Sequence, residues 1–364
     1  MSFHKIAYLE WARRHMGTVR YDLARSNIRS LTREELDFTF DDIPAASIDE
    51  TGLPALRKTI ADRYGIGPER VFISNGATMG IYLACAAALE PDDEVLVEAP
   101  NYEPLYRIPK HLGASIKMLE RSFERGWQID LEEFERRVSR HTKAVLLTNL
   151  HNPSGTGTNP DKMLTIGQIA RDHGAQVIVS EVYLDSCFAS GHRPAVTFGD
   201  NLVSIGSLSK VYGLGGLRMG WIAGGEELIR RIHSIQDYIA GGVSAASQML
   251  ALKALAKADL LAERCRKIVR DNLRLLSEWM KKRTDLAWVE PEGGTVALLK
   301  LPGTIDAIEL SNHLREKSGT LVVPGDFFWL RGFVRVSLGI DEETLKGGLK
   351  HLGAAIDHFK TRGR

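Results

Sequence analysis

Short apolar runs alternate with longer helical patterns between about residue 70 and residue 225, and this alternation limits the fold more than any other feature. The runs are VFIS, EVLVEA, AVLLTN, VIVSEVY, LVSIGSLS and RMGWIAG, starting at residues 71, 94, 144, 177, 202 and 218. Helical patterns such as MGIYLACAAALE and DKMLTIGQIARDHG separate several of them. Strands that alternate with helices in this way form a largely parallel sheet with helices on both faces. We therefore expect an α/β fold.

The pattern changes after Gly224. Long helical patterns follow, and the last part of the chain mixes helices with the strand patterns TVALLKL and FVRVSLG. This α+β composition indicates a second, smaller domain, which the amphipathic N-terminal helix is expected to join because chain ends commonly meet in space. We expect a large domain over residues 31–274 and a small domain formed by residues 1–30 and 275–364.

Composition excludes several classes of function. The 364 residues carry a net charge of +1, so no overall field attracts nucleic acid or an anionic membrane. The three cysteines lack the spacing of a metal site and favour a reducing compartment. The N-terminus has no apolar centre of a signal peptide, and the apolar stretch 81–89 is too short to span a membrane. We expect a cytoplasmic protein with no metal, nucleic acid or membrane partner.

The stretch GSLSKVYGLGGLRMGW at residues 206–221 is the most informative. Taken alone, Lys210 is read as a solvated surface charge. Here hydroxyl groups and a guanidinium (Ser207, Ser209 and Arg218) surround it at a strand end, and such groups suit a dianionic phosphate. A desolvated lysine beside them suits Schiff-base chemistry, because burial lowers the pKa of an amine.

The glycines of this loop do not fit a nicotinamide cofactor. Gly213, Gly215 and Gly216 lead into Arg218, at a position where the dinucleotide motif G-x-G-x-x-G requires glycine. We exclude that class of enzyme on this ground.

A second anion site is predicted in SNGATMGIYLA, at residues 74–84. A strand ends there, Gly76, Ala77 and Thr78 form a turn, and a helix begins. Free N–H groups and the positive end of the helix dipole attract anions at such a turn. An ordinary strand-to-helix turn explains the same residues equally well.

Three further residues are candidates for a planar, carboxylate-bearing ligand. Asn152 follows the run AVLLTN, where its amide could reach a ring hydroxyl, although asparagine before proline is most often a turn former. Tyr102 could stack on a ring or simply fill space. Arg335 lies between Val334 and Val336 in an apolar strand, so it needs a partner: a substrate carboxylate or a structural acid.

Together these segments resemble the aspartate-aminotransferase superfamily of pyridoxal-phosphate enzymes, fold type I, aminotransferase class I/II. SLSKVYGLGGLRMG matches the family's lysine motif S-x-S-K-x-x-G-x-x-G-x-R-x-G, and HNPSG and VPG…VRVS occur in the family's order. The similarity runs from about residue 52 to residue 339.

The resemblance implies the following roles. Lys210 would form the Schiff base with pyridoxal 5'-phosphate and move the proton of the substrate. Arg335 would bind the substrate α-carboxylate, with Asn152 beside it. The cofactor would be bound by Gly76, Ala77, Thr78, Tyr102, Asn152, Tyr183, Ser207, Ser209 and Arg218. The partners would be small molecules, an amino acid and a 2-oxo acid, and the protein would be a homodimer.

Two departures from the family are visible. Ser180 stands where the family usually has an aspartate that pairs with the pyridinium nitrogen, and a serine cannot supply that charge. We expect its hydroxyl near that nitrogen, while neighbouring Glu181 points to the other face. The tyrosine that family members often lend to the neighbouring subunit has no counterpart in PAASIDETGLP, residues 44–54.

We expect an aminotransferase that moves an amino group between an L-amino acid and a 2-oxo acid. A carbon–sulfur β-lyase is the alternative that Ser180 favours, and a non-catalytic cofactor-binding regulatory protein is a third. The position in the family makes five residues candidates for the substrate pocket, although packing explains each as well: Tyr21, Asn27, Phe327, Phe328 and Trp329.

Overall fold

The computed structural model describes residues 5–36, 39 and 51–362, and its largest sheet confirms the expected α/β fold. Within these residues this sheet has seven strands in the order β2-β8-β7-β6-β5-β3-β4. Neighbours run parallel except at β8, which is antiparallel to β2 and β7. The strands are β2 (Val71–Ser74), β3 (Glu94–Ala99), β4 (Ser115–Glu120), β5 (Thr142–Thr148), β6 (Gln176–Ser180), β7 (Leu202–Ser207) and β8 (Gly220–Ala223).

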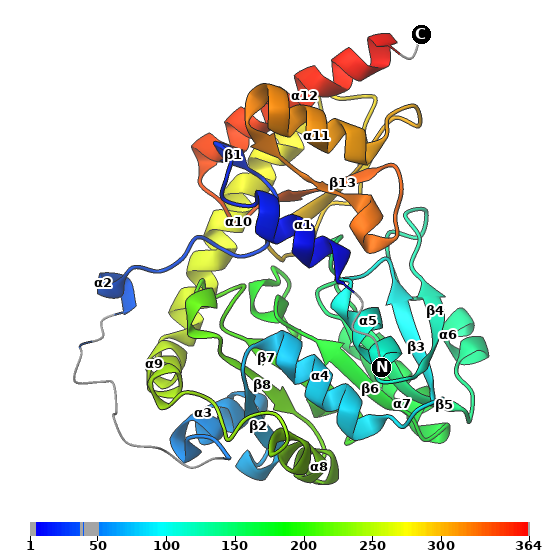
Figure 1. The fold of residues 1–364 in the computed structure, drawn as a ribbon, viewed down its shortest axis with the longest axis vertical. Helices are drawn as coiled ribbons and strands as arrows, with labels where there is room; N and C mark the ends of the chain where they lie inside the picture. The colour runs from blue at the N-terminus through cyan, green and yellow to red at the C-terminus, as the bar shows by residue number, and fades with distance from the viewer. Residues whose placement is uncertain (1–4, 37–38, 40–50, 363–364) are drawn as a thin grey trace.

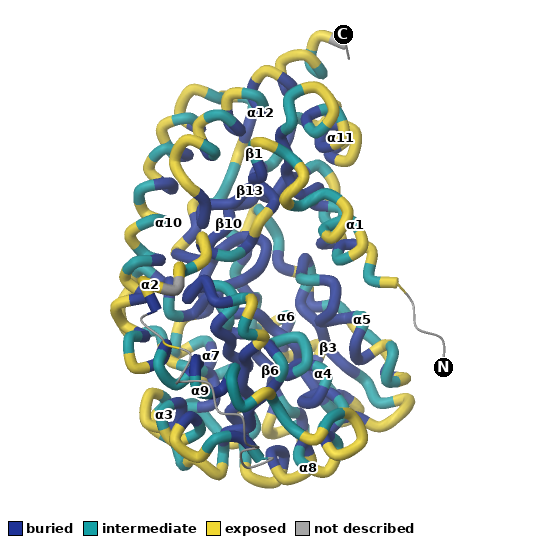
Figure 2. The backbone as a smooth tube through the Cα atoms, turned by 60° about the vertical axis from the view of Figure 1, so that its left-hand side comes forward, coloured by how far each residue is buried: buried dark blue, intermediate teal, exposed yellow. Residues whose placement is uncertain are grey.

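Helices cover both faces of this sheet, which explains its apolar strands. Val95 and Val97 pack in the core beneath one group of helices, and Leu96 between them packs in the core on the opposite face. The first group is α4 (Ala77–Ala88), α5 (Pro104–His111) and α8 (Glu226–Gln236); the second is α6 (Leu131–Arg137) and α7 (Pro160–Asp172). Figure 2 shows β3 and β6 as buried segments in the interior.

The C-terminal part of the chain forms a smaller α+β unit together with the chain's beginning (Figure 1). Its antiparallel sheet has the order β12-β13-β10-β9, and β1 pairs with β11 in parallel. The strands are β1 (Tyr21–Asp22), β9 (Ala287–Trp288), β10 (Val296–Lys300), β11 (Thr320–Leu321), β12 (Val323–Pro324) and β13 (Phe333–Ser337). The remaining helices of the described residues are α1 (Ala7–His15), α2 (Arg33–Leu36), α3 (Pro54–Tyr64), α9 (Ala245–Ala256), α10 (Ala258–Met280), α11 (Ala307–Ser318) and α12 (Glu342–Arg362).

Helix α1 packs on the C-terminal part of the chain. Tyr8 lies in an apolar cluster with Leu321, Val323 and Phe328. A larger apolar core is continuous between the two units, since it contains Leu56 as well as residues of α12. The domain boundaries therefore stay a prediction.

Two local features differ from the sequence interpretation. Strand β4 was not predicted, because it lies at the sheet edge and its exposed residues are polar. The run VIVSEVY ends as a strand at Ser180, and Tyr183 lies in the turn that leads into the short 3-10 helix Leu184–Ser186. Across the described ranges, no helix combines the length and apolarity needed to cross a membrane.

Candidate active site

The structure brings the predicted site residues to one cavity of about 290 Å³, at the carboxyl ends of β5, β6 and β7. The last residue of each strand, Thr148, Ser180 and Ser207, lines it. Parallel strands place such residues at a common edge, where α/β sheets bind ligands. Except for Gly76, every predicted site residue lines this cavity: Ala77, Thr78, Tyr102, Asn152, Ser180, Tyr183, Ser207, Ser209, Lys210, Arg218 and Arg335.

Lys210 lies in the loop after β7 with its amine inside the cavity. Its Nζ donates a hydrogen bond to Ser26 Oγ at 2.7 Å. Burial lowers the pKa of Lys210 to about 8, and the positive charges of Arg335 and Arg218 act in the same direction. A buried amine with this pKa is deprotonated readily, which is what a nucleophilic lysine requires.

One end of the cavity lies at the start of α4, where Ala77, Thr78 and Arg218 line it and Gly76 directly precedes the helix. Gly76 has φ +80°, and a Cβ built on it would lie 2.6 Å from Arg218 Nη2. Only glycine allows the guanidinium to lie this close to the backbone at that turn. Nearby, Ser207 Oγ accepts a hydrogen bond from the backbone N–H of Ser209 at 2.9 Å. A cation, hydroxyls and a helix N-terminus together suit a phosphate.

Tyrosine hydroxyls lie on the wall between the lysine and α1. Tyr183 donates to the backbone oxygen of Ser26 at 3.0 Å, and burial raises the pKa of Tyr183. Tyr102 meets Tyr8 edge to face with ring centroids 5.9 Å apart, and burial also raises the pKa of Tyr102. Tyr183 and Tyr102 therefore stay neutral and keep their hydroxyl hydrogens at physiological pH.

Arg335 is buried, and its hydrogen-bond partners are neutral. It donates to Asn152 Oδ1 at 3.1 Å, to Tyr8 Oη at 2.9 Å and to the backbone oxygen of Ala24 at 3.1 Å. Its guanidinium carbon lies 4.9 Å from the centre of the Phe328 ring. Among the described residues no carboxylate forms an ion pair with Arg335, so the positive charge is available to an anionic ligand.

Ser180 and the two nearby acids have different surroundings. Ser180 lines the cavity, whereas Glu181 does not. Glu181 accepts a hydrogen bond from the backbone N–H of Ala195 at 2.9 Å, and burial raises its pKa to about 8. Asp185 accepts a hydrogen bond from Tyr212 instead. This arrangement agrees with the expectation that Glu181 points away from the ligand.

Apart from Asn27, the residues that the N-terminal segment contributes were not predicted from the sequence. Ser26 lines the cavity. So do three residues of α1, Tyr8, Leu9 and Ala12, and Met16, which directly follows the helix. None of them lies in a motif or next to a strand end of the large sheet. The apolar face of α1 was a visible signal, but it did not indicate which surface it covers.

Most of the substrate-pocket candidates named from family position lie elsewhere. Asn27 lines the cavity, but Tyr21, Phe327, Phe328 and Trp329 do not. Tyr21 packs against His351, Trp329 against Tyr106, and Phe327 against Tyr8. Phe328 packs beneath Arg335, so it supports the site from behind.

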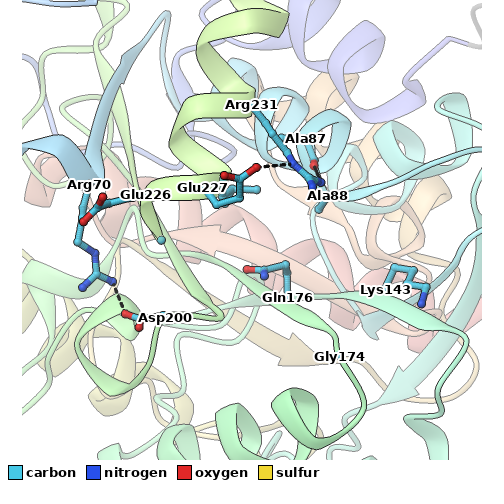
Figure 3. A pocket seen from close by; sticks show the side chains of 12 residues that line it. Arg70, Ala87, Ala88, Lys143, Gly174, Gln176, Asp200, Glu226, Glu227 and Arg231 are labelled. Carbon is cyan, nitrogen blue, oxygen red and sulfur yellow. Dashed lines mark hydrogen bonds and ion pairs between the residues drawn. The ribbon is translucent and has the colours of Figure 1, made fainter.

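A larger hollow of about 580 Å³ lies at the amino ends of β5, β6 and β7, opposite the Lys210 cavity. Figure 3 shows the residues that line it. Gln176, the first residue of β6, lies on its wall. Its arginines have partners: Arg70 lies 3.1 Å from Asp200, and Arg231 lies 3.3 Å from Glu227. This hollow shares no lining residue with the cavity that contains Lys210, so it is not part of the candidate site.

The fold and the cavity together define a fold type I pyridoxal-phosphate enzyme. Residues 21–352 match the family model "Aminotransferase class I and II". The chain belongs to this family, as the sequence motifs predicted.

Individual proteins support the same assignment. The chain is 27% identical to capreomycidine synthase of Streptomyces vinaceus, over 98% of this chain and 95% of that protein. It is also 27% identical to an aspartate aminotransferase of Thermotoga maritima, over 89% and 85% of the two chains. The crystal structure of a PLP-dependent aminotransferase from Streptococcus suis superposes with a TM-score of 0.93 and 29% identity, covering 99% of both chains.

The protein is thus a pyridoxal-phosphate-dependent aminotransferase. The residues present fit the cofactor: Lys210 supplies a buried amine, and the Arg218 guanidinium, which packs against Gly76, supplies a cation for a phosphate. The comparisons lend no support to the lyase alternative.

Proposed function

We propose that this chain transfers the amino group of an L-amino acid to a 2-oxo acid, with Lys210 as the residue that bonds to the cofactor and moves the substrate proton. The observation that carries this proposal is the convergence of Lys210, Arg218 and Arg335 in one cavity. Lys210 offers a nucleophilic amine, Arg218 suits a phosphate, and Arg335 suits a carboxylate.

The cofactor would lie between the start of α4 and the end of β6. Arg218, Ser207, Ser209 and the turn at Gly76 would bind its phosphate. Tyr102 would stack on its ring, and Asn152 would donate a hydrogen bond to its phenolic oxygen. Tyr183 would do the same once its single O–H turns away from the backbone oxygen of Ser26. When bound, pyridoxal phosphate supplies an electron-withdrawing ring that stabilises negative charge on the substrate α-carbon.

Arg335 would orient the substrate by binding its α-carboxylate. The guanidinium is held by Asn152, Tyr8 and Ala24, so its direction is fixed before the substrate arrives. Lys210, with its pKa lowered to about 8, would take the α-proton as a neutral amine and return it.

The substrate side chain would face α1. Leu9, Ala12 and Met16 on this side of the cavity are apolar, which favours an apolar side chain over a second carboxylate. The relative from Thermotoga maritima is named an aspartate aminotransferase, so aspartate is the natural comparison substrate.

We further propose that the protein is a homodimer in the cytoplasm. Each chain would consist of a large domain over residues 31–274 and a small domain formed by residues 1–30 and 275–364. Tyr238 is 93% exposed and Ile239 is 40% exposed beside it, and a second copy would cover such side chains. Light scattering in solution would give the mass of two chains; the mass of one would contradict the dimer.

An amino-acid panel tests the proposed activity. Purified protein loaded with pyridoxal phosphate is given leucine, methionine, phenylalanine or aspartate, each with and without 2-oxoglutarate or pyruvate. Product that depends on the acceptor supports transamination. Ammonia and a 2-oxo acid released without any acceptor would support a lyase, and no product with bound cofactor would support a non-catalytic protein.

Ser180 gives a prediction about the ring nitrogen. Ser180→Asp is expected to shift the pH at which the bound cofactor's absorbance titrates and to increase transamination about tenfold, because a carboxylate keeps a nearby pyridinium protonated. Absorbance titration and initial rates measure both effects. The exposed Ser190→Asp variant is the control; if the Ser180 variant behaves like it, the placement of Ser180 near the nitrogen is wrong.

A further inference from the structure

Ser26 contacts the amine of Lys210 directly. It lies in the segment between β1 and α2, is 9% exposed, and lines the cavity. The 2.7 Å hydrogen bond between its Oγ and Lys210 Nζ is the only side-chain hydrogen bond of this amine among the described residues. Among the described side chains, the Ser26 hydroxyl is therefore the hydrogen-bond partner that fixes the direction of the amine.

The backbone of this segment is anchored, so the position of the Ser26 hydroxyl is well defined. The carbonyl oxygen of Ser26 accepts hydrogen bonds from Tyr183 Oη at 3.0 Å and from Thr295 Oγ1 at 2.7 Å. Two residues further on, the backbone N–H of Ile28 donates to the carbonyl oxygen of Lys210 at 3.1 Å. The serine and the lysine are thus fixed to each other by main chain as well as by side chain.

We propose that Ser26 is a positioning residue for Lys210, which holds the free amine during the part of the reaction in which Lys210 is not bonded to the cofactor. A neutral amine must aim its lone pair at the substrate proton. If one of its N–H bonds is donated to Ser26 Oγ, its rotation is restricted and the lone pair stays free. This inference rests on the proposed role of Lys210 and adds a residue that no sequence motif indicates.

Because two arginines lie in the same cavity, the hydrogen bond to Ser26 affects the pKa of the Lys210 amine. The charged and titratable groups that share its cavity are Arg335 of β13, Arg218 before β8, Tyr183 after β6, Tyr102 before α5 and Tyr8 of α1. The two arginines oppose a positive charge on Lys210. The Ser26 hydroxyl accepts a stronger hydrogen bond from an ammonium than from an amine, so it acts against the arginines.

The test compares Ser26→Ala with Ser30→Ala, which removes a hydroxyl from an exposed position of the same segment. In the cofactor-free protein, labelling of Lys210 by an amine-reactive reagent is followed against pH by peptide mass spectrometry. Labelling of the wild type should rise through about pH 8, since the neutral amine is the reactive form and the pKa of Lys210 is lowered to about 8. Ser26→Ala should move this midpoint down by about half a unit to one unit, because the charged form loses its acceptor.

Steady-state kinetics of the loaded enzyme provide the second measurement. Ser26→Ala should lower kcat about 10- to 100-fold and leave KM for the amino acid within about twofold, because the substrate still binds but the amine is misaligned. Ser26→Thr keeps the hydroxyl and should restore the midpoint. If Ser26→Ala does not fold, Ser26→Cys, which keeps the bulk and has a poor acceptor, is measured by the same criteria.

A Ser26 variant with the midpoint and kcat of Ser30→Ala would overturn the inference. Failure of the proposed function is detected separately. Borohydride reduction of the loaded wild type, followed by peptide mass analysis, identifies the lysine that carries the cofactor. A modified lysine other than Lys210 would refute the proposed function, whereas the labelling midpoint and kcat of Ser26→Ala, compared with those of Ser30→Ala, decide the role of Ser26.

Discussion

Replacing Lys210 with alanine is expected to lower the rate of transamination at least about a thousandfold, because no other group would bond to the cofactor and move the α-proton. The other basic side chains of the cavity, Arg335 and Arg218, are guanidinium groups and cannot replace a primary amine. Initial rates with an amino acid and a 2-oxo acid measure the loss. Borohydride reduction should no longer attach the cofactor to the protein.

The exposed Lys110→Ala variant is the control for removal of a lysine charge, and it should keep the wild-type rate. Circular dichroism should show that Lys210→Ala is folded, since removing a buried amine creates no unpaired charge. A Lys210→Ala variant that retains the wild-type rate would show that the assignment of Lys210 is wrong.

Replacing Arg335 with lysine is expected to lower kcat/KM for the amino acid about 100-fold or more, mainly through a higher KM. A lysine keeps the charge but loses the planar fork that binds a carboxylate through two parallel hydrogen bonds. It also cannot reproduce the three contacts that orient Arg335: Asn152, Tyr8 and the backbone oxygen of Ala24.

Arg331→Lys is the matched control, because Arg331 is exposed four residues before Arg335 in the same part of the chain. Its KM should equal that of the wild type. Cofactor binding should be unaffected in both variants, since Arg218 remains. An unchanged KM in Arg335→Lys would mean that the α-carboxylate binds elsewhere.

The large sheet and the lysine loop could be predicted because their signals are local. A strand buried on both faces is apolar along its length, so β5, β6 and β7 were visible as continuous runs. The loop carries its site residues close together in the sequence: Ser207, Ser209, Lys210 and Arg218. Together they predict a phosphate site beside a Schiff-base lysine. Strand β4 escaped prediction because an edge strand carries polar residues.

The contribution of α1 could not be predicted, because it depends on a contact between distant parts of the chain. Tyr8 and Arg335 are 327 positions apart, yet they share a hydrogen bond of 2.9 Å. Likewise Ser26 and Lys210 are 184 positions apart, yet they share a hydrogen bond of 2.7 Å. The aromatic residues after VPGD were assigned to the pocket by position alone, and packing against Tyr8, Arg335 and Tyr106 determines where they lie.

Transfer of a ¹⁵N label tests the central claim most directly. The loaded protein is given a ¹⁵N-labelled amino acid of the panel and an unlabelled 2-oxo acid, and the products are identified by mass spectrometry. The account predicts that the label appears in the amino acid formed from the added 2-oxo acid, with no such product in Lys210→Ala. Label released as ammonia at the same rate with and without the 2-oxo acid would contradict it.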